Sequence, residues 1–212
     1  MMRILLAIMG SILIVSGTTS AQEWAEYVDQ EEHFAINFPG TPEILEFGYA
    51  SEYGVTLPAK AYTLNNDEAA YSLTVVNYNE GQRIYEELPD RTDEGNNSAL
   101  WLYDQRAATS YAAHNIRKRG GEITFDAWNH IDMVEGHQLQ VTNVDESRTY
   151  AGIYLHQGRL YIIEATVPAG GLPQGLFQQS LSFLDDEARR IRYQLTPDGS
   201  KTRVPRPVTG TY

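Results

Sequence analysis

Two histidines and an aspartate in the middle of the chain form its densest group of residues able to ligate a metal ion. His130 and Asp132 stand two positions apart, and His137 follows shortly after. Residues two apart on a strand face the same side, so His130 and Asp132 together could hold one ion. The stretch 132–136 also has the polar composition of a turn between strands. We expect the turn, and keep a metal site at His130, Asp132 and His137 as the alternative.

Tyrosine is frequent in this chain, with 14 copies, and three of them fall in one predicted hairpin. The pair Gln157-Gly158 between two apolar runs is typical of a two-residue turn, which pairs Tyr154 with Tyr161. Tyr150, Tyr154 and Tyr161 then share one face. Such a surface suits contact with a carbohydrate or a protein, because tyrosine combines apolar area with a hydrogen-bonding tip. The other interpretation is that a helix covers this face and the tyrosines belong to the core, which is what we expect; a ligand-binding surface is the alternative.

Glu164 is a carboxylate inside an apolar, strand-like run. The same hairpin register places it on the face of Leu160 and Ile162. A carboxylate in such a place must be paired, hydrogen-bonded or protonated, because its desolvation otherwise costs several kcal/mol. Glu164 is therefore either a functional acid or ligand-binding carboxylate, or a structural group that caps a helix or pairs with an arginine such as Arg148 or Arg106. We expect the structural role.

The common sequence patterns of catalytic sites are absent. The chain contains no Gly-x-Ser-x-Gly elbow, no phosphate-cradling glycine loop and no His-Glu-x-x-His helix. It also contains no cysteine, which excludes a thiol enzyme, a disulfide scaffold and a cysteine-based zinc site. We therefore expect a non-catalytic domain without a cofactor, and a hydrolase-type enzyme that uses Glu164 remains the least favoured alternative.

The elements that must position these residues are mostly strands. Period-two alternation and turn signals predict strands over residues 24–28, 33–38, 43–52, 56–64, 69–78, 122–128, 137–144, 147–156 and 159–167. A polar loop is expected over 79–97, a long helix over 99–118 that ends at Gly120-Gly121, and a closing helix over 174–184. Short connections between adjacent strands favour an antiparallel sheet. The order predicts an α+β fold with helices flanking the sheet.

Three short segments resemble the PsbP-like domains. Residues 32–42 are similar to the opening strand of that family, residues 158–168 to its late strand, and residues 177–184 to its closing helix. As an order of elements, the resemblance covers residues 24–184. It implies an α-β-α sandwich around an antiparallel sheet, in exported proteins that are mostly non-catalytic. Some members of the family are extrinsic subunits of photosynthetic complexes and others are assembly factors, and no photosystem-specific signature stands out here.

The N-terminal residues 1–21 predict a secretory signal peptide. An apolar run over 4–15 follows Arg3, and small residues lead to Ala21, where we expect cleavage. The run is shorter than the ~20 apolar residues of a spanning helix. The alternatives are a buried N-terminal helix and an uncleaved anchor. The predicted domains are thus the signal peptide, a single domain over 22–184 and a loosely held, charged and proline-containing tail over 185–212.

The charge balance restricts the partners. The chain carries 28 acidic and 16 basic side chains, a formal net charge of −12, which disfavours nucleic acid and anionic membranes as partners. We expect a periplasmic or secreted domain, soluble after cleavage, that binds an unknown protein partner or assists envelope assembly. The alternative is a small-molecule or metal-ion binding module.

Overall fold

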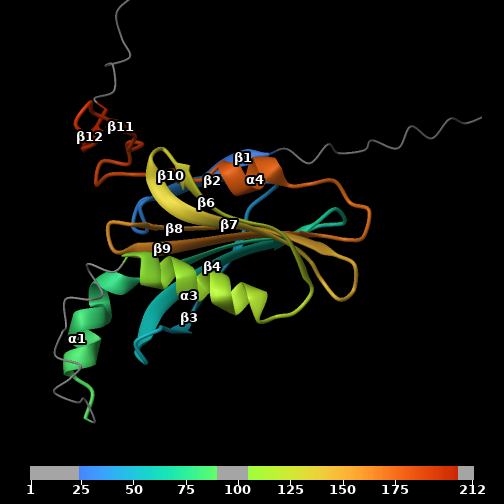
Figure 1. The fold of residues 1–212 in the computed structure, drawn as a ribbon, viewed down its shortest axis with the longest axis horizontal. Helices are drawn as coiled ribbons and strands as arrows, with labels where there is room; N and C mark the ends of the chain where they lie inside the picture. The colour runs from blue at the N-terminus through green and yellow to red at the C-terminus, as the bar shows by residue number, and fades with distance from the viewer. Residues whose placement is uncertain (1–23, 90–104, 205–212) are drawn as a thin grey trace, which may run out of the picture.

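The computed structural model describes residues 24–89 and 105–204. Its largest element is a seven-stranded sheet in the order β3-β4-β5-β9-β8-β7-β6, and every neighbouring pair is antiparallel (Figure 1). The strands are β3 (Glu43–Ala50), β4 (Thr56–Asn65), β5 (Ala70–Asn77), β6 (Glu122–Ile131), β7 (Val134–Thr142), β8 (Arg148–His156) and β9 (Arg159–Val167). The expected antiparallel sheet is confirmed.

One face of the large sheet is covered by a short helix and a second small sheet. That sheet has the order β1-β2-β10, and the helix is α4 (Gly175–Gln179). Its strands are β1 (Ala25–Asp29), β2 (Phe34–Phe38) and β10 (Ser182–Phe183). Phe34, Phe177 and Phe183 pack against tyrosines of β8 and β9 in one aromatic core. Alternation along β2 explains this cover, because its phenylalanines and Ile36 point to the same side.

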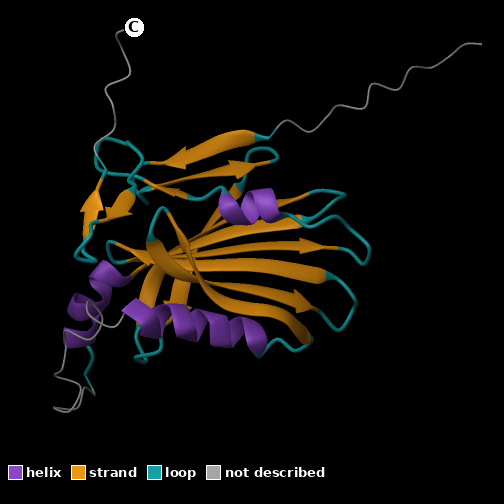
Figure 2. Ribbon diagram, turned by 45° about the horizontal axis from the view of Figure 1, so that its top comes forward, coloured by secondary structure: helices purple, strands orange, loops and turns teal. Residues whose placement is uncertain are grey.

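The opposite face of the large sheet carries helix α3 (Gln105–Arg117). Figure 2 shows this helix lying along the sheet on the side away from α4. Small side chains of α3, Ala108, Ala112 and Ala113, pack with Ile116 onto Leu139 and its apolar neighbours on β7 and β8. Alanines allow the helix backbone to approach the sheet closely, since they bring little side-chain volume to the contact.

The hairpin register predicted around Gln157-Gly158 is confirmed. Leu155 pairs with Leu160, and Tyr154 pairs with Tyr161. Gln157 and Gly158 both have positive φ values, 48° and 73°, as a two-residue turn of this kind requires. This register fixes which side chains of β8 and β9 face each layer of the molecule.

Two predicted segments differ from the structure, and a third, the long helix, is described only in part. The helix expected over 99–118 is described from 105 to 117, and residues 99–104 lie outside the described residues. The loop expected over 79–97 contains a 3-10 turn, η1 (Tyr78–Glu80), and helix α1 (Gly81–Glu86), while residues 90–97 also lie outside the description. The closing helix expected over 174–184 stops at 179, because Ser182 and Phe183 pair as a strand with β2.

The turn between β6 and β7 is shorter than the sequence indicates. Asp132 and Met133 alone form it, with φ values of 49° and 66°, and residues 134–136 belong to strand β7. Glu135 is polar because it lies near the start of β7, beside the edge strand β6, where its side chain is 58% exposed. Polar composition by itself therefore extended the predicted turn too far.

Residues 185–204 of the predicted C-terminal tail pack on the domain, and residues 205–212 lie outside the described residues. The packed part forms a hairpin of β11 (Tyr193–Leu195) and β12 (Lys201–Arg203). Ile191 is buried in the aromatic core, and the backbone N–H of Ile191 donates to the carbonyl of Phe183. The charged and prolyl composition predicted a loose tail, but one apolar side chain and several ion pairs attach residues 185–204 to the domain.

Candidate functional site

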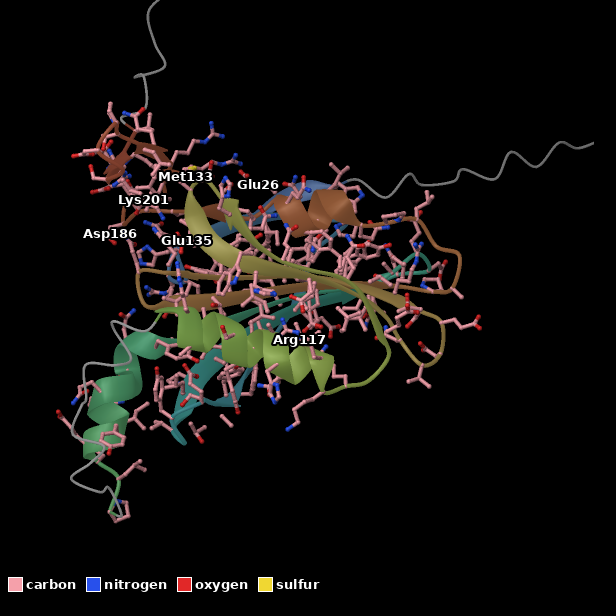
Figure 3. All side chains as sticks on the ribbon, viewed as in Figure 1. Glu26, Arg117, Met133, Glu135, Asp186 and Lys201 are labelled. Atoms are coloured by element: carbon pink, nitrogen blue, oxygen red, sulfur yellow. The ribbon has the colours of Figure 1, made fainter. Side chains whose placement is uncertain are left out.

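A cleft opens where the start of α3, the β6–β7 hairpin and the C-terminal hairpin meet. It consists of two adjoining hollows with volumes of about 390 and 350 Å³. Five residues line both hollows: Arg106, Trp128, Met133, Glu135 and Lys201. We call this region the Trp128 cleft. Figure 3 shows Met133, Glu135 and Lys201 together at the end of the molecule that carries β11 and β12.

Trp128 is the largest exposed side chain of the cleft. It lies on the edge strand β6 and is 53% exposed. The guanidinium carbon of Arg106 lies 5.7 Å from the centre of the indole ring, and the ring of His137 meets the indole edge-on at 5.0 Å between centroids. A cation over an aromatic ring contributes about 0.5–1 kcal/mol at exposed sites. The indole is therefore held by two neighbours while half of its surface remains accessible.

The charged groups of the cleft are two cations around one carboxylate. Glu135 Oε2 lies 3.4 Å from Arg106 Nη2, and Glu135 Oε1 lies 3.9 Å from Lys201 Nζ. The three side chains are 58%, 74% and 40% exposed, respectively. Glu135 reaches Arg106 because both lie on the α3 side of the sheet, and it reaches Lys201 because β12 folds back over the β6–β7 hairpin. These groups make the cleft locally positive in an acidic chain.

The floor of the cleft contains a buried histidine. His156 Nε2 lies 2.9 Å from the hydroxyl of Tyr193, and its ring packs against Phe183. Burial, reinforced by the nearby His33 and Arg203, lowers the pKa of His156 to about 4. The ring is consequently neutral at physiological pH. Its Nδ1 atom is buried and has no hydrogen-bond partner among the described residues.

The C-terminal hairpin forms one wall of the cleft and is attached by polar contacts. The backbone N–H of Tyr193 donates to the carbonyl of Asp132 at 3.2 Å, and Arg192 Nε lies 3.4 Å from the Asp132 carboxylate. Arg203 forms an ion pair with the buried Asp185, which also accepts from Arg189. Burial works against ionisation of Asp185, but hydrogen bonds from these two arginines outweigh it and hold its pKa well below its usual range.

The three candidate metal ligands take different partners. Asp132 lies in the turn and contacts Arg192, while His130 lies opposite Glu135 on the neighbouring strand. His137 Nε2 is hydrogen-bonded to the carboxylate of Asp126. Nowhere in residues 24–89 and 105–204 do three His, Cys, Asp or Glu side chains group in a way that could hold a metal ion. The structure thus gives the metal interpretation no geometric support.

Asp126 and Arg117 form a compact charged pair next to His137. Arg117 donates to both carboxylate oxygens of Asp126, at 2.8 and 2.9 Å. Burial raises the pKa of Asp126, but hydrogen bonds from His137 and Arg117 outweigh that effect and lower it overall. This bidentate geometry attaches the last turn of α3 to strand β6.

Glu164 has the structural role that the sequence favours, with a different partner. Its side chain is 16% exposed, and both carboxylate oxygens bind the guanidinium of Arg119, with Nη2 at 3.0 Å from Oε1. Neither predicted arginine pairs with it. Arg148 instead donates to the carbonyl of Gly171, and Arg106 belongs to the cleft. Arg119 follows α3 and reaches β9 because the helix ends over that strand.

The tyrosines of the β8–β9 hairpin lie in the core and do not form an exposed surface. Tyr150, Tyr154 and Tyr161 do share one face, but all three are buried in the aromatic core beneath the small sheet and α4. The Tyr161 hydroxyl donates to the carbonyl of Glu32 at 2.8 Å. Gly136 on β7 lies against the Tyr154 ring, where a Cβ atom would come within 2.1 Å of it. This burial agrees with the core position that we expect from the sequence.

Sequence reasoning missed the residues that form the cleft. Trp128 was visible as a lone tryptophan in an alternating strand just before His130. The turn signal Asp198-Gly199 pointed to a hairpin that could bring Lys201 back to the domain. Arg106 carried no local signal, since charged residues on a helix normally face water.

Comparisons with known proteins find similar solved structures at low sequence identity. No protein-family model matches the chain, and no curated protein matches it. The structure is similar to the solution structure of cyanobacterial PsbP from Synechocystis, with a TM-score of 0.39 and 15% identity, over 75% of this chain and 86% of that chain. It is also similar to a Pseudomonas aeruginosa protein of unknown function, with a TM-score of 0.30 and 10% identity, over 68% and 83%.

These similarities indicate neither an activity nor a partner for this chain. In the segments 24–89 and 105–204, the helices are too short or too polar to cross a membrane.

Proposed function

We propose that this chain is an exported, non-catalytic domain that binds an extended segment of another protein, with the Trp128 cleft as the contact site. The observation that carries the proposal is the exposed Trp128 on an edge strand, held beside Arg106 and Glu135 in an open cleft. Tryptophan and arginine are enriched among the residues that dominate binding at protein interfaces.

Strand β6 offers such a segment a place to lie. Within the described residues β6 pairs only with β7, so its other edge has no neighbouring strand there. The backbone N–H of His130 donates to the Asn129 side chain at 2.7 Å. Most of its residues are exposed, including Phe125 at 43% and Trp128 at 53%. An extended peptide can add to such an edge as a further strand, with backbone hydrogen bonds giving affinity and adjacent pockets giving specificity.

The proposal also includes export of the chain and a three-layered domain. Residues 1–21 lie outside the described residues, and their pattern favours export to the periplasm or the medium with cleavage near Ala21. We also group α3, the large sheet and the layer of α4 with the small sheet as an α-β-α sandwich over the domain 22–184. N-terminal sequencing of the exported protein is expected to begin at Gln22.

A small molecule is the second candidate ligand for the same cleft. Each hollow falls in the lower part of the volume range of small-molecule sites, which is roughly 300–1,000 Å³. An exposed indole beside charged groups also suits a flat polar ligand. This alternative differs from the main proposal in one measurable way, because it does not involve the edge of β6.

Site-specific photo-crosslinking in cells tests the proposal. A photoreactive residue is placed at His130, an exposed residue that lines the cleft beside Trp128, and at Phe47 on the opposite edge strand β3 in a matched control. Phe47 is 40% exposed, so both positions can react with a neighbour. A discrete protein adduct from position 130, weakened by R106A and W128A and absent from position 47, is expected. Equal adducts from the two positions, or none from position 130, would contradict the proposal.

A further inference from the structure

We infer that the segment bound at the Trp128 cleft carries a carboxylate, and that Glu135 occupies the place of that carboxylate in the free protein. The inference rests on the proposed function and adds the chemistry of the partner. It makes Glu135 an internal competitor: an acidic side chain of the partner displaces it and takes over its two cations.

The contacts of Glu135 are the first observation. Arg106 and Lys201 approach this carboxylate only to 3.4 and 3.9 Å. A compact charge-assisted hydrogen bond is about 2.7–2.9 Å long, and the Arg117–Asp126 pair of the same helix reaches 2.8 and 2.9 Å. The two cations of the cleft therefore share one anion without either of them making a full contact with it.

The exposure of the three groups is the second observation. The side chains of Arg106, Glu135 and Lys201 are between 40% and 74% exposed, so Glu135 can rotate into water at little cost. An exposed ion pair contributes about 0–1 kcal/mol, which a ligand carboxylate in better geometry can match or exceed. The cations come from α3 and β12, elements far apart in the sequence that converge on one point.

The distribution of charge is the third observation. Residues 189–204 contain five basic side chains and one acidic side chain, Asp198, in a chain whose net charge is −12. Arg192 and Arg203 pair with Asp132 and Asp185 and attach the hairpin. Lys201 is the basic residue of this hairpin that lines the cleft. The other four basic side chains of residues 189–204 pair with carboxylates elsewhere in the molecule. Lys201 and Arg106 are therefore the cations that favour an acidic segment over a basic one at the cleft.

An acidic protein segment fits these observations better than other anions. The free edge of β6 runs past the cleft, since Trp128, Asn129 and His130 line its second hollow. An extended peptide can hydrogen-bond to this edge, place an apolar residue on Trp128 and direct a carboxylate to Arg106 and Lys201. Nucleic acid would bring many phosphates to a chain that is strongly negative as a whole.

Fluorescence anisotropy with the full chain after signal removal tests the inference. The probes are three labelled peptides in which valine and threonine alternate and the central polar positions are aspartate, asparagine or lysine. We expect the order aspartate, asparagine, lysine in affinity. E135Q is expected to tighten the aspartate peptide about two- to fivefold and to leave the asparagine peptide unchanged, while R106A and K201A each weaken the aspartate peptide by a similar factor.

E87Q is the matched control, because it removes one exposed carboxylate that pairs with an arginine in α1, away from the cleft. Glu87 is 65% exposed and lies 2.9 Å from Arg83. Tightening by E87Q as large as that by E135Q assigns the effect to total charge and overturns the inference. So does equal binding of the three peptides, but then the proposed function stands. Binding of none of them, or binding that survives W128A, overturns both.

Discussion

The two ends of helix α3 are attached to the same sheet by the same kinds of residue, yet they differ in how closely the charges meet. At the C-terminal end, Arg117 and Arg119 bind Asp126 and Glu164 through both carboxylate oxygens. At the N-terminal end, Arg106 meets Glu135 through a single contact of 3.4 Å. Glu164 is 16% exposed, whereas Glu135 is 58% exposed.

This difference separates groups that hold the fold from groups that are available to a partner. A largely buried carboxylate such as Glu164 depends on its arginine, because removal of the arginine leaves a desolvated charge without a partner. An exposed carboxylate can exchange its partner with little change in stability. The cleft therefore lies at the N-terminal end of α3, where the ion pairs are long and exposed. We call this the open end. The close ion pairs at the C-terminal end, which we call the closed end, hold the helix on the sheet.

The largest expected effect concerns the buried floor of the cleft. The pKa of His156 is lowered to about 4, so the unfolded chain binds a proton below pH 6.5 and the folded chain does not. The contribution of the neutral His156 to the free energy of unfolding is therefore fully present above pH 6.5. The free energy of unfolding falls by up to about 3 kcal/mol as the pH drops from 6.5 to 4. Urea denaturation across this range measures the slope, and H156Q is expected to reduce it. H114Q, at an exposed position of α3, serves as the control.

Replacing Arg119, which directly follows α3, tests how much the ion pairs at the C-terminal end of the helix contribute to stability. R119A leaves Glu164 without its bidentate partner, and we expect a loss of roughly 1–3 kcal/mol in the free energy of unfolding. R106A, at the N-terminal end, is expected to cost at most about 1 kcal/mol, mainly from its contact with the Trp128 indole. Equal losses in thermal or urea denaturation would remove the distinction between the two ends.

Asp126 gives a smaller effect with its own pH dependence. Because its pKa is lowered in the folded chain, Asp126 stabilises the fold at pH values above the ordinary pKa of aspartate. This stabilisation is lost as the pH falls through the lowered pKa of Asp126. D126N is expected to cost about 1 kcal/mol at neutral pH, since the pair is partly exposed. D67N, which makes the same change in an exposed turn, is expected to leave the urea midpoint nearly unchanged.

A substitution of Trp128 is expected to affect peptide binding much more than stability. Because the indole is half exposed, W128A is expected to cost at most about 1 kcal/mol in stability, mainly from its contacts with Arg106 and His137. Binding of the acidic peptide is expected to fall below detection. The two measurements on one variant, urea denaturation and anisotropy, separate a binding residue from a structural one. Loss of both together would make Trp128 part of the fold.

Sequence patterns predicted most strands of the large sheet and showed that Glu164 needs a partner. Period-two alternation predicted nearly every strand of the large sheet, and the turn Gln157-Gly158 predicted the register of β8 with β9. That register placed Glu164 among apolar side chains, and desolvation required a partner for it. Local periodicity carries this information because it states which side chains share a face.

Tertiary structure decided what each face meets. The same alternation that grouped Tyr150, Tyr154 and Tyr161 did not show that α4 and the small sheet cover them. The partner of Glu164 proved to be Arg119, from another element. The physical reason is that packing and long-range ion pairs depend on how elements stack. Arg106, Trp128 and Lys201 are far apart in the chain, and they form a cleft only because α3, β6 and β12 fold to one end of the molecule.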